Sequence, residues 1–411
     1  MRVRVNRGMP VGAVELVESL EPLFAPAPVR LSRVGTRDGA STAWSVVPSL
    51  RRPIVLVPAA NRDAAVAFRP SRAGSGGRKM RALAFLQHTG LLRLLPLPKV
   101  VVERSRVEDL LGVVREVVGD ADDLVVRLGR RRFNRAVVLV VLGRSGDIGA
   151  FVKVARSAEG QAALELEYRN LLAMVERPVT GLRPPQPLGY WRSGGVDFLA
   201  LEPLLSDEVH PPRPLPVAQM LRLAGRAPSP GPEGAAAPAM VDSDYVRRLR
   251  ARVEELTDPE QRAWVVRALD KIVEKHGQVP LPMGPWHGDW VPWNMVRRGD
   301  EVLLWDWEHF TADVPCGFDH VHYLAQDIRT EIGTDAAAED RWVVEASSEL
   351  DRDWALSPAQ IEAVLRLYLI EVNVRYLQDR QDDPLGTPPR AGWSVDLLAR
   401  LDPDTTWSHV A

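Results

Sequence analysis

Between residues 120 and 205, hydrophobic residues gather in short runs that turn sequences interrupt. The runs are rich in β-branched residues and read DDLVVRLG, RAVVLVVL and AFVKVA, in that order. This spacing is typical of three strands in an antiparallel meander. The next segment, EGQAALELEYRNLLAM, places Leu164, Tyr168, Leu171 and Met174 on one helical face. VDFLALEPLL then indicates another strand, so this part of the chain is predicted to be a small β-rich lobe with one helix.

From residue 206 onward the pattern becomes helical. DPEQRAWVVRALDKIVEKHG follows Thr257, which we expect to cap the helix in a capping box with Glu260. A later helix is expected to begin with Ser357 as its cap and Pro358 at its first position. The low-complexity segment at 225–240 cannot bury a core, so it is expected to be a mobile loop.

Residues 1–100 are expected to form an accessory region. They contain apolar runs such as PIVLVPA at 53–59, and an amphipathic helix that closes near Gly90. Residues 51–100 hold ten Arg or Lys and a single acid, Asp63. Such a basic stretch is either a solvated surface or a docking surface for an anionic substrate, a membrane surface, or a peptide or protein partner.

Composition narrows the class of protein. The 411 residues carry a net charge of −2, which gives no bulk field that would indicate nucleic acid as a partner. The longest strongly apolar run, at 136–142, is far shorter than the ~20 residues of a membrane span. The N-terminus lacks the apolar core of a signal peptide, and the single cysteine, Cys316, excludes a disulfide within the chain. We therefore expect a cytoplasmic α+β protein with parts at 1–100, 101–205 and 206–411.

Candidate chemistry is concentrated in PWHGDWVPWNMVRRGDEVLLWDWEHF, residues 285–310. This stretch holds Asp289, Asn294 and Asp306 among five tryptophans. Pro292 keeps the first two out of a regular helix, and EVLLWDWE predicts a short strand carrying Asp306 at its end. A loop and a strand end can bring the three side chains together. One carboxylate and one amide oxygen, with phosphate oxygens, suit Mg²⁺, and a second carboxylate could accept a hydroxyl proton.

The sequence His287-Gly-Asp289-x4-Asn294, followed by Trp-Asp306-Trp-Glu, resembles the aminoglycoside phosphotransferase and choline kinase group, whose fold is similar to that of protein kinases. The resemblance covers roughly residues 120–410. It implies a bilobal protein kinase-like fold with a small antiparallel β lobe and a larger helical lobe, and ATP and Mg²⁺ as cofactors. It also implies that Asp289 is the catalytic base and that Asn294 and Asp306 hold Mg²⁺.

The same resemblance implies a set of nucleotide-binding residues. Lys153 matches the third-strand lysine that pairs with the α- and β-phosphates, and Glu167 matches the helix glutamate that positions this lysine. Glu165 is the alternative for the latter role. The residues where the interlobe linker would meet adenine are Leu201, Glu202, Pro203 and Leu204.

The loop that would cover the phosphates departs from the family pattern. Residues 129–135, GRRRFNR, contain only Gly129 and no G-x-G-x-x-G. Phosphate would have to be held by backbone N–H groups and by Arg130, Arg131 or Arg132, because a guanidinium group matches phosphate oxygens well.

Other residues near the motif have structural interpretations. Asp319 matches a family aspartate that braces the catalytic loop. His320 and His322 could suggest a metal pair, but no third ligand stands out. The tryptophans are expected to pack around the loop and strand, with Trp290 or Trp293 alternatively forming an aromatic wall for the acceptor.

The acceptor class can be predicted in part. Gly288 stands where protein kinases have an arginine, and only twelve residues lie between Asp306 and Asp319. So short a segment favours a small-molecule acceptor, and the resemblance points to aminoglycosides, sugars, amino alcohols or nucleosides. Two alternatives stay open: a kinase for Ser or Thr of a ribosomal peptide bound by residues 1–100, and a nucleotide-binding scaffold without turnover. The sequence does not indicate an oligomeric state.

Overall fold

The structure, a computed structural model, describes residues 10–32, 39–68, 75–129, 137–205, 215–226, 237–382 and 392–401. The chain divides into two compact units. The first comprises Met1–Glu176 and Pro184–His210, and the second comprises Arg177–Arg183 and Pro211–Ala411.

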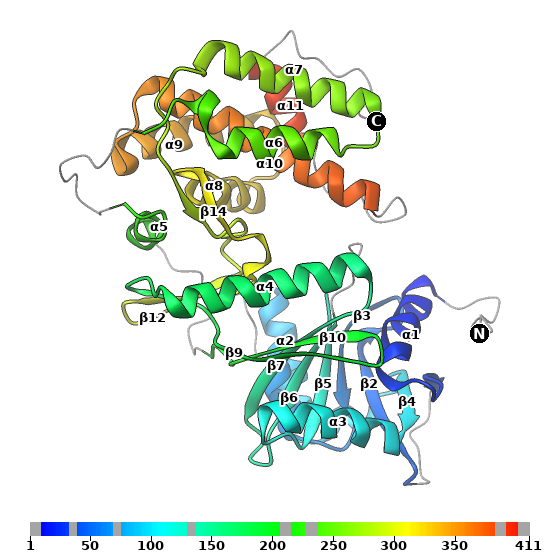
Figure 1. Cartoon of the computed structure of the whole chain (residues 1–411). Helices are drawn as coiled ribbons and strands as arrows, with labels where there is room; N and C mark the ends of the chain where they lie inside the picture. The colour runs from blue at the N-terminus through cyan, green and yellow to red at the C-terminus, as the bar shows by residue number, and fades with distance from the viewer. Residues whose placement is uncertain are drawn as a thin grey trace. The chain divides into compact units, whose positions relative to one another are not determined.

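The first unit is built on a nine-stranded sheet in the order β1-β4-β2-β3-β5-β6-β7-β10-β9, in which every neighbouring pair is antiparallel (Figure 1). Its strands are β1 (Arg30–Ser32), β2 (Ser41–Ser49), β3 (Arg52–Pro58), β4 (Lys99–Glu103), β5 (Asp123–Leu128), β6 (Val137–Leu142), β7 (Ile148–Ala155), β9 (Pro187–Ser193) and β10 (Val196–Leu201). Its helices are α1 (Val11–Phe24), α2 (Ser75–His88), α3 (Arg104–Val118) and α4 (Ala158–Glu176), with 3₁₀ turns η1 (Asp63–Phe68) and η2 (Leu91–Leu94).

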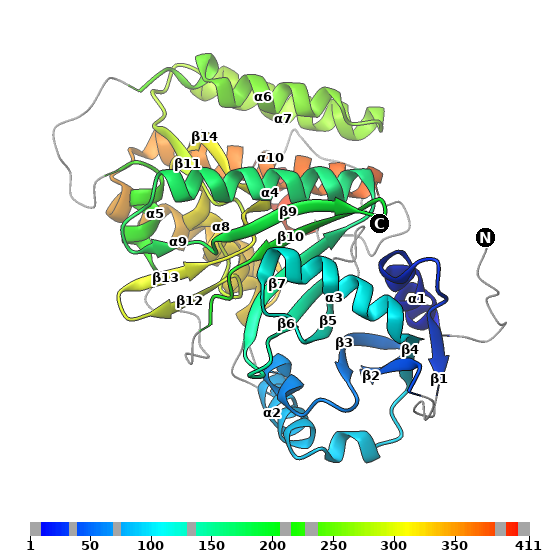
Figure 2. The ribbon, with the colours of Figure 1, turned by 60° about the horizontal axis from the view of Figure 1, so that its bottom comes forward.

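Helices cover both faces of this sheet, as Figure 2 shows. One face packs with α1 and α3 into a core that includes Leu20 and Leu110. The opposite face packs with η1, α2 and η2 around Phe68 and Leu92, and farther along it lies against α4. Because both faces are buried, the central strand β6 is apolar at every position rather than alternating.

Strands on either side of residue 100 belong to this one sheet. β4 spans Lys99–Glu103, and β3 pairs with β5 through Val55 opposite Arg127. The indole Nε1 of Trp44 on β2 also donates to the carbonyl of Leu124 on β5, at 2.9 Å. Residues 10–103 thus extend the sheet that carries β5, β6 and β7.

The second unit is mainly helical. Its helices are α5 (Val217–Leu223), α6 (Asp244–Glu254), α7 (Pro259–His276), α8 (Phe318–Glu331), α9 (Ala336–Trp354), α10 (Pro358–Asp382) and α11 (Gly392–Leu401), with η3 (Met240–Asp242) and η4 (Trp307–His309). Its short strands are β8 (Leu182–Arg183), β11 (Met283–Trp286), β12 (Met295–Arg298), β13 (Glu301–Leu304) and β14 (Thr311–Pro315). The expected α+β class, an antiparallel sheet followed by a helical part, is confirmed.

Helix starts in this unit follow local chemistry. The prediction that Thr257 caps α7 is wrong, because the Asp258 side chain accepts from the Glu260 and Gln261 amides and Pro259 occupies the first turn. Pro259 lacks an N–H, so a cap directly before it satisfies the next free amides. The Ser357 hydroxyl does accept from the Gln360 amide, at 3.4 Å, and α10 begins at Pro358 as predicted.

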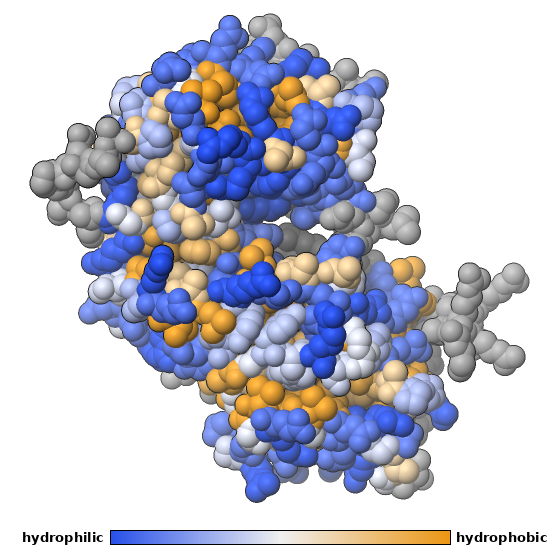
Figure 3. All heavy atoms as spheres, viewed as in Figure 1, coloured by the Kyte–Doolittle hydropathy of each residue, from blue (hydrophilic) through white to orange (hydrophobic). Residues whose placement is uncertain are grey.

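None of the described helices combines the length and the apolar character that a membrane span needs. On the face drawn in Figure 3, hydrophilic side chains predominate and hydrophobic ones form smaller patches between them. Of the low-complexity segment expected at 225–240, residues 227–236 lie outside the described residues.

Candidate active site

Lys153 and Glu167 form an ion pair in the first unit. Lys153 lies on β7, and its Nζ donates to both carboxylate oxygens of Glu167 on α4, at 2.6 and 2.7 Å. The Lys153 side chain is 17% exposed and that of Glu167 1%, so the pair is shielded from solvent. Glu165, the alternative partner, instead pairs with Arg169 one turn along the exposed face of α4. The structure therefore places Glu167 beside Lys153.

Arg127 lies on the same face of the sheet as Lys153, one strand removed. Arg127 on β5 is opposite Val138 on β6, and Val138 is opposite Lys153 on β7. Residues opposite one another in adjacent strands point to the same face. Burial lowers the pKa of Arg127, and among the described residues no acid or hydrogen-bond acceptor compensates its charge. A cation in this setting is stabilised when it binds an anion.

The other residues expected to contact the nucleotide lie where two strands of this unit end, at the last residues of β5 and of β10. Gly129 directly follows β5, while Arg130, Arg131 and Arg132 lie outside the described residues. Leu201 ends β10 and is buried, and the Glu202 amide donates to the Gln186 carbonyl at 2.9 Å. Leu204, two residues farther on, is half-buried.

In the second unit, a hairpin brings Asn294 and Asp306 together. β12 and β13 pair with Met295 opposite Leu304, and the Trp305 amide donates to the Asn294 carbonyl at 3.0 Å. Asn294 therefore enters the hairpin and Asp306 leaves it at the same end. Asp306 has φ 67° and ψ 62°, a left-handed conformation that costs a non-glycine residue roughly 1–2 kcal/mol. Backbone strain of this kind is concentrated at functional sites.

Asp289 is held by side chains on both of its carboxylate oxygens. Asn294 Nδ2 donates to Asp289 Oδ2 at 2.8 Å and to its backbone carbonyl at 3.1 Å. His322 Nε2, on α8, lies 3.2 Å from Asp289 Oδ1. Because the amide nitrogen of Asn294 faces Asp289, its amide oxygen is the atom left to bind a cation. The Asp289 side chain is 34% exposed, so a reactant can reach it.

The peptides of His287 and Gly288 are clamped from two helices. Asp319 on α8 accepts from the His287 amide at 2.7 Å and from the Gly288 amide at 3.0 Å. Arg375 on α10 donates to the Gly288 carbonyl at 2.7 Å. Gly288 has φ +83°, and a Cβ there would lie 2.3 Å from the His309 carbonyl oxygen, so only glycine fits. These bonds give Asp319 the bracing position that the resemblance implies.

The charge states in this loop favour an ionised Asp289 among neutral histidines. Burial opposes ionisation of Asp289, but the hydrogen bond from His322 and the electrostatic influence of His322, His309 and His287 together outweigh it and hold the pKa of Asp289 well below its usual value. Burial lowers the pKa of His322 and lowers that of His287 to about 4. Burial raises the pKa of the Asp319 carboxyl, and the two amide N–H bonds oppose that rise. At neutral pH, Asp289 is a carboxylate able to accept a hydrogen bond from a hydroxyl.

Three residues described above escaped the sequence analysis: Arg127 in the first unit, and in the second unit Arg375 and His322 as a partner of Asp289. Only weak signals could have found them. His322 follows Asp319 by three residues on α8, so the two share a helical face. Arg375 lies more than 80 residues from the loop it contacts, and spacing gives no clue to such a contact.

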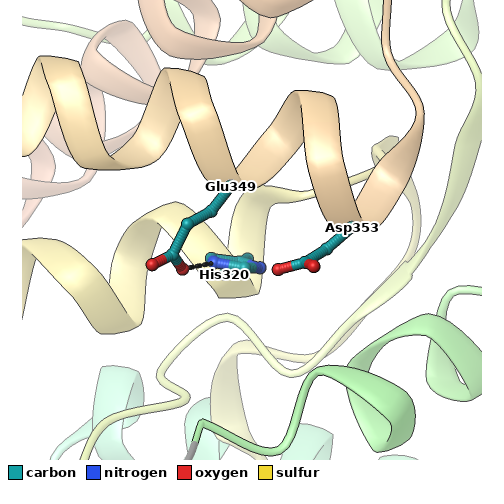
Figure 4. A group of neighbouring side chains, drawn as sticks. All are labelled: His320, Glu349 and Asp353. Carbon is teal, nitrogen blue, oxygen red and sulfur yellow. Dashed lines mark hydrogen bonds and ion pairs between the residues drawn. The ribbon is translucent and has the colours of Figure 1, made fainter.

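His320, expected as half of a metal pair, belongs to a different cluster. Among the described residues, His320, Glu349 and Asp353 place ligand atoms within 4.8 Å of one another (Figure 4). However, the Trp354 indole donates to His320 Nδ1 at 3.0 Å, so the neutral ring carries its proton on Nε2, which lies 2.6 Å from Glu349. Both ring nitrogens are occupied by protein groups, and the cluster fits a structural role that ties α8 to α9.

Most tryptophans around the loop are buried in the protein interior rather than exposed to an acceptor. Trp290 is fully buried, with its Nε1 2.9 Å from the Met295 sulfur, so it is not a wall open to an acceptor. Trp307 is also fully buried and donates to the Leu304 carbonyl at 2.8 Å. The guanidinium carbon of Arg375 lies over the Trp286 ring, 5.2 Å from the ring centroid. Trp293 is half-buried. Rigid aromatic packing here holds the loop and the hairpin in one geometry.

No family model and no curated protein matches the sequence. Among solved structures, a thermostable mutant of aminoglycoside phosphotransferase APH(4)-Ia is similar, with 15% identity, coverage of 72% of this chain and 100% of that chain, and a TM-score of 0.46. Aminoglycoside phosphotransferase APH(3'')-Id from Streptomyces rimosus ATCC10970 has 18% identity, coverage of 65% and 97%, and a TM-score of 0.39. Amicoumacin kinase hAmiN has 10% identity, coverage of 74% and 94%, and a TM-score of 0.42. These three structures each match between 65% and 74% of this chain.

Proposed function

We propose that this protein is a phosphotransferase that moves the γ-phosphoryl group of Mg·ATP to a hydroxyl group of a small molecule. The observation that carries the proposal is the arrangement at the β12–β13 hairpin. Asn294 and Asp306 stand at its open end, and the Asn294 amide nitrogen holds Asp289. This arrangement supplies a carboxylate for the acceptor beside two oxygen ligands for a metal.

The metal-binding residues of this proposal are Asn294 and Asp306. Their donor set is one amide oxygen and one carboxylate, and hard oxygen ligands of this kind suit Mg²⁺, which retains several waters and takes further oxygens from phosphates. The orientation of the Asn294 amide fits, since its nitrogen is used by Asp289. When bound, Mg²⁺ would neutralise charge on the transferring phosphates.

The other residues act on the two reactants. Asp289 would accept a hydrogen bond from the acceptor hydroxyl and take its proton, an effect worth on the order of 10²–10⁴ in rate. Lys153, oriented by Glu167, would bind the α- and β-phosphates. Arg127, on the same face of the sheet as Lys153, would add a second positive charge. This charge would compensate for the missing G-x-G-x-x-G pattern in residues 129–135. A guanidinium group is well suited to phosphate oxygens.

The segment after Asp306 supports a small acceptor. η4 (Trp307–His309) and β14 (Thr311–Pro315) occupy eight of the twelve residues between Asp306 and Asp319. β14 is tied into a sheet with β11, so this segment is not a long activation segment of the kind on which a protein substrate lies. An acceptor such as an aminoglycoside, sugar, nucleoside or amino alcohol is therefore favoured over a protein.

The test is transfer of label from γ-labelled ATP, with Mg²⁺, to a panel of aminoglycosides, sugars, nucleosides, amino alcohols and Ser/Thr peptides. We expect label in one small-molecule class, and in Asp289→Asn a transfer rate lower by about 10²–10⁴-fold, with nucleotide binding retained. Label moving to peptides alone would replace the small-molecule acceptor by a peptide. Nucleotide binding without transfer to any class, or transfer at an undiminished rate in Asp289→Asn, would contradict the proposal.

A further inference from the structure

A buried chain of three side chains ends at the carboxylate proposed to act on the acceptor. Tyr368 on α10 is fully buried, and its hydroxyl lies 3.0 Å from His322 Nδ1. The other ring nitrogen of His322 lies 3.2 Å from Asp289 Oδ1. His322 is 4% exposed, so bulk water does not compete for either contact.

The chemistry of the two ends determines where the protons lie. An ionised carboxylate only accepts hydrogen bonds, so His322 Nε2 must carry the proton that faces Asp289. A neutral imidazole then has a lone pair on Nδ1, and the Tyr368 hydroxyl donates to it. The tyrosine therefore selects the tautomer in which His322 donates to Asp289, much as other buried groups set the tautomer of functional histidines.

The result is an Asp289 carboxylate restrained at both oxygens. His322 donates to Oδ1, and Asn294 Nδ2 donates to Oδ2 at 2.8 Å. Each oxygen retains another lone pair for an acceptor hydroxyl. Two donors on opposite oxygens fix the rotation of the carboxyl group about its last bond, and such pre-orientation matters because a displacement near 1 Å can cost about 10²-fold in rate.

We propose that His322 is a positioning residue for phosphoryl transfer, acting through Asp289, and that Tyr368 holds it in the donor tautomer. This inference rests on the proposed function for its kinetic consequences, but its geometry can be tested without activity. It differs from the bracing by Asp319 and Arg375, because those residues hold the backbone of the loop and His322 holds the reacting side chain.

The kinetic test compares variants of the full chain. His322→Leu removes the donor, and we expect kcat to fall about 10- to 10²-fold with KM for ATP changed less than about twofold. His322→Gln carries an amide donor near the position of Nε2 and should recover most of kcat. Tyr368→Phe should lower kcat less than His322→Leu does. His320→Gln is the matched control, since His320 is equally buried on α8 and is bonded to Glu349 and Trp354 rather than to Asp289.

A double-mutant comparison with Asp289 tests whether His322 acts through Asp289 or affects the structure in general. In the Asp289→Asn background, His322→Leu should cause little further loss of kcat, because the two residues act as one unit. Equal losses in both backgrounds, or a loss in His320→Gln as large as that in His322→Leu, would contradict the inference.

An NMR experiment tests the geometry even if no acceptor is phosphorylated. With ¹⁵N-labelled histidine, and with His322→Gln to assign the signals, His322 should show a proton on Nε2 at pH 7, and Tyr368→Phe should introduce the Nδ1-protonated form. An Nδ1-protonated His322 in the unaltered chain would overturn the inference. Failure of phosphoryl transfer with the Nε2-protonated form present would overturn the proposed function alone.

Discussion

Lys153 and Glu167 meet in an ion pair that uses both carboxylate oxygens, at 2.6 and 2.7 Å from Nζ. Glu167 is fully buried in α4, and Lys153 comes from β7 beneath it. A buried carboxylate of this kind is stable only with its cation in place, since removal of one partner leaves an uncompensated charge. The pair therefore links the stability of the first unit to the position of the lysine.

Variants of Lys153 and Glu167 should show that the pair contributes to folding stability and that Lys153 contributes separately to phosphate transfer. Lys153→Met removes the cation that faces both carboxylate oxygens of the buried Glu167, so we expect the free energy of unfolding to fall by about 3–5 kcal/mol. The double variant Lys153→Met/Glu167→Leu should recover most of that stability in urea unfolding but not the transfer of phosphate. Glu165→Gln is the control, because its pair with Arg169 is exposed and such pairs contribute roughly 0.3–0.5 kcal/mol. A fully active double variant would argue against a phosphate-binding role for Lys153.

Arg127→Met should weaken nucleotide binding without weakening the fold. Arg127 is half-buried and has no compensating partner among the described residues, so methionine removes a partly desolvated charge. We expect the dissociation constant for Mg·ATP, measured by calorimetry, to rise about 10-fold, the equivalent of one charge-assisted hydrogen bond. Thermal stability without nucleotide should stay level or rise. Arg144→Met, in an exposed turn of the same unit, should change neither quantity, and an unchanged affinity in Arg127→Met would exclude a contact with the phosphates.

Gly288→Ala should destabilise the second unit far more than a matched glycine change. Gly299 also has a positive φ, +60°, but a Cβ there meets no atom within 4 Å, so Gly299→Ala should cost only about 1–2 kcal/mol of backbone strain. At Gly288 the added Cβ would in addition collide with the His309 carbonyl, which adds about 1–3 kcal/mol of overpacking. Urea unfolding of both variants measures the difference. Equal losses would mean that the loop shifts freely away from His309.

Stability should decline as pH falls below about 6.5, partly because of His287. The pKa of His287 is lowered to about 4 by burial, so between pH 4 and 6.5 the unfolded chain binds a proton that the folded chain does not. The folded state is then disfavoured by up to about 1.4 kcal/mol per pH unit for this group. His287→Gln should reduce the slope of the free energy of unfolding against pH over this range, whatever it does to stability at pH 7. An unchanged slope would show that His287 titrates at its ordinary pKa.

Removing residues 1–100 should prevent the first unit from folding. The deletion takes away β1, β2 and β3 and the first part of β4, and it leaves β5 without the neighbour that pairs with it through Val55 and Leu56. Leu124 and Val126 on β5 would also lose the core formed with α1 and Trp44. We expect the truncated chain to be insoluble or to show no cooperative unfolding by circular dichroism. A soluble, active fragment would show that the sheet from β5 onward folds by itself.

The sequence by itself determined the local features of this protein. β-branched runs predicted β5, β6 and β7, because strand formation depends on neighbouring side chains, and residues 285–310 indicated a loop with Asp289 and Asn294 followed by a strand with Asp306 at its end, although not the hairpin that β12 and β13 form. Capping residues near a proline predicted where α7 and α10 begin, although Asp258 rather than Thr257 caps α7. Such features lie within a few residues of one another, where chain geometry leaves few alternatives.

Only the tertiary structure decided which distant residues meet. Glu165 and Glu167 are two residues apart in one helix, and the packing of α4 on the sheet determines which of them reaches Lys153. His322, Tyr368 and Arg375 come from helices that follow the loop, and no spacing predicts that they converge on Asp289 and Gly288. Likewise, β3 pairs with β5 across about 70 residues of sequence. Such contacts depend on burying apolar faces of whole elements against one another, a non-local energy that a pattern along the chain does not record.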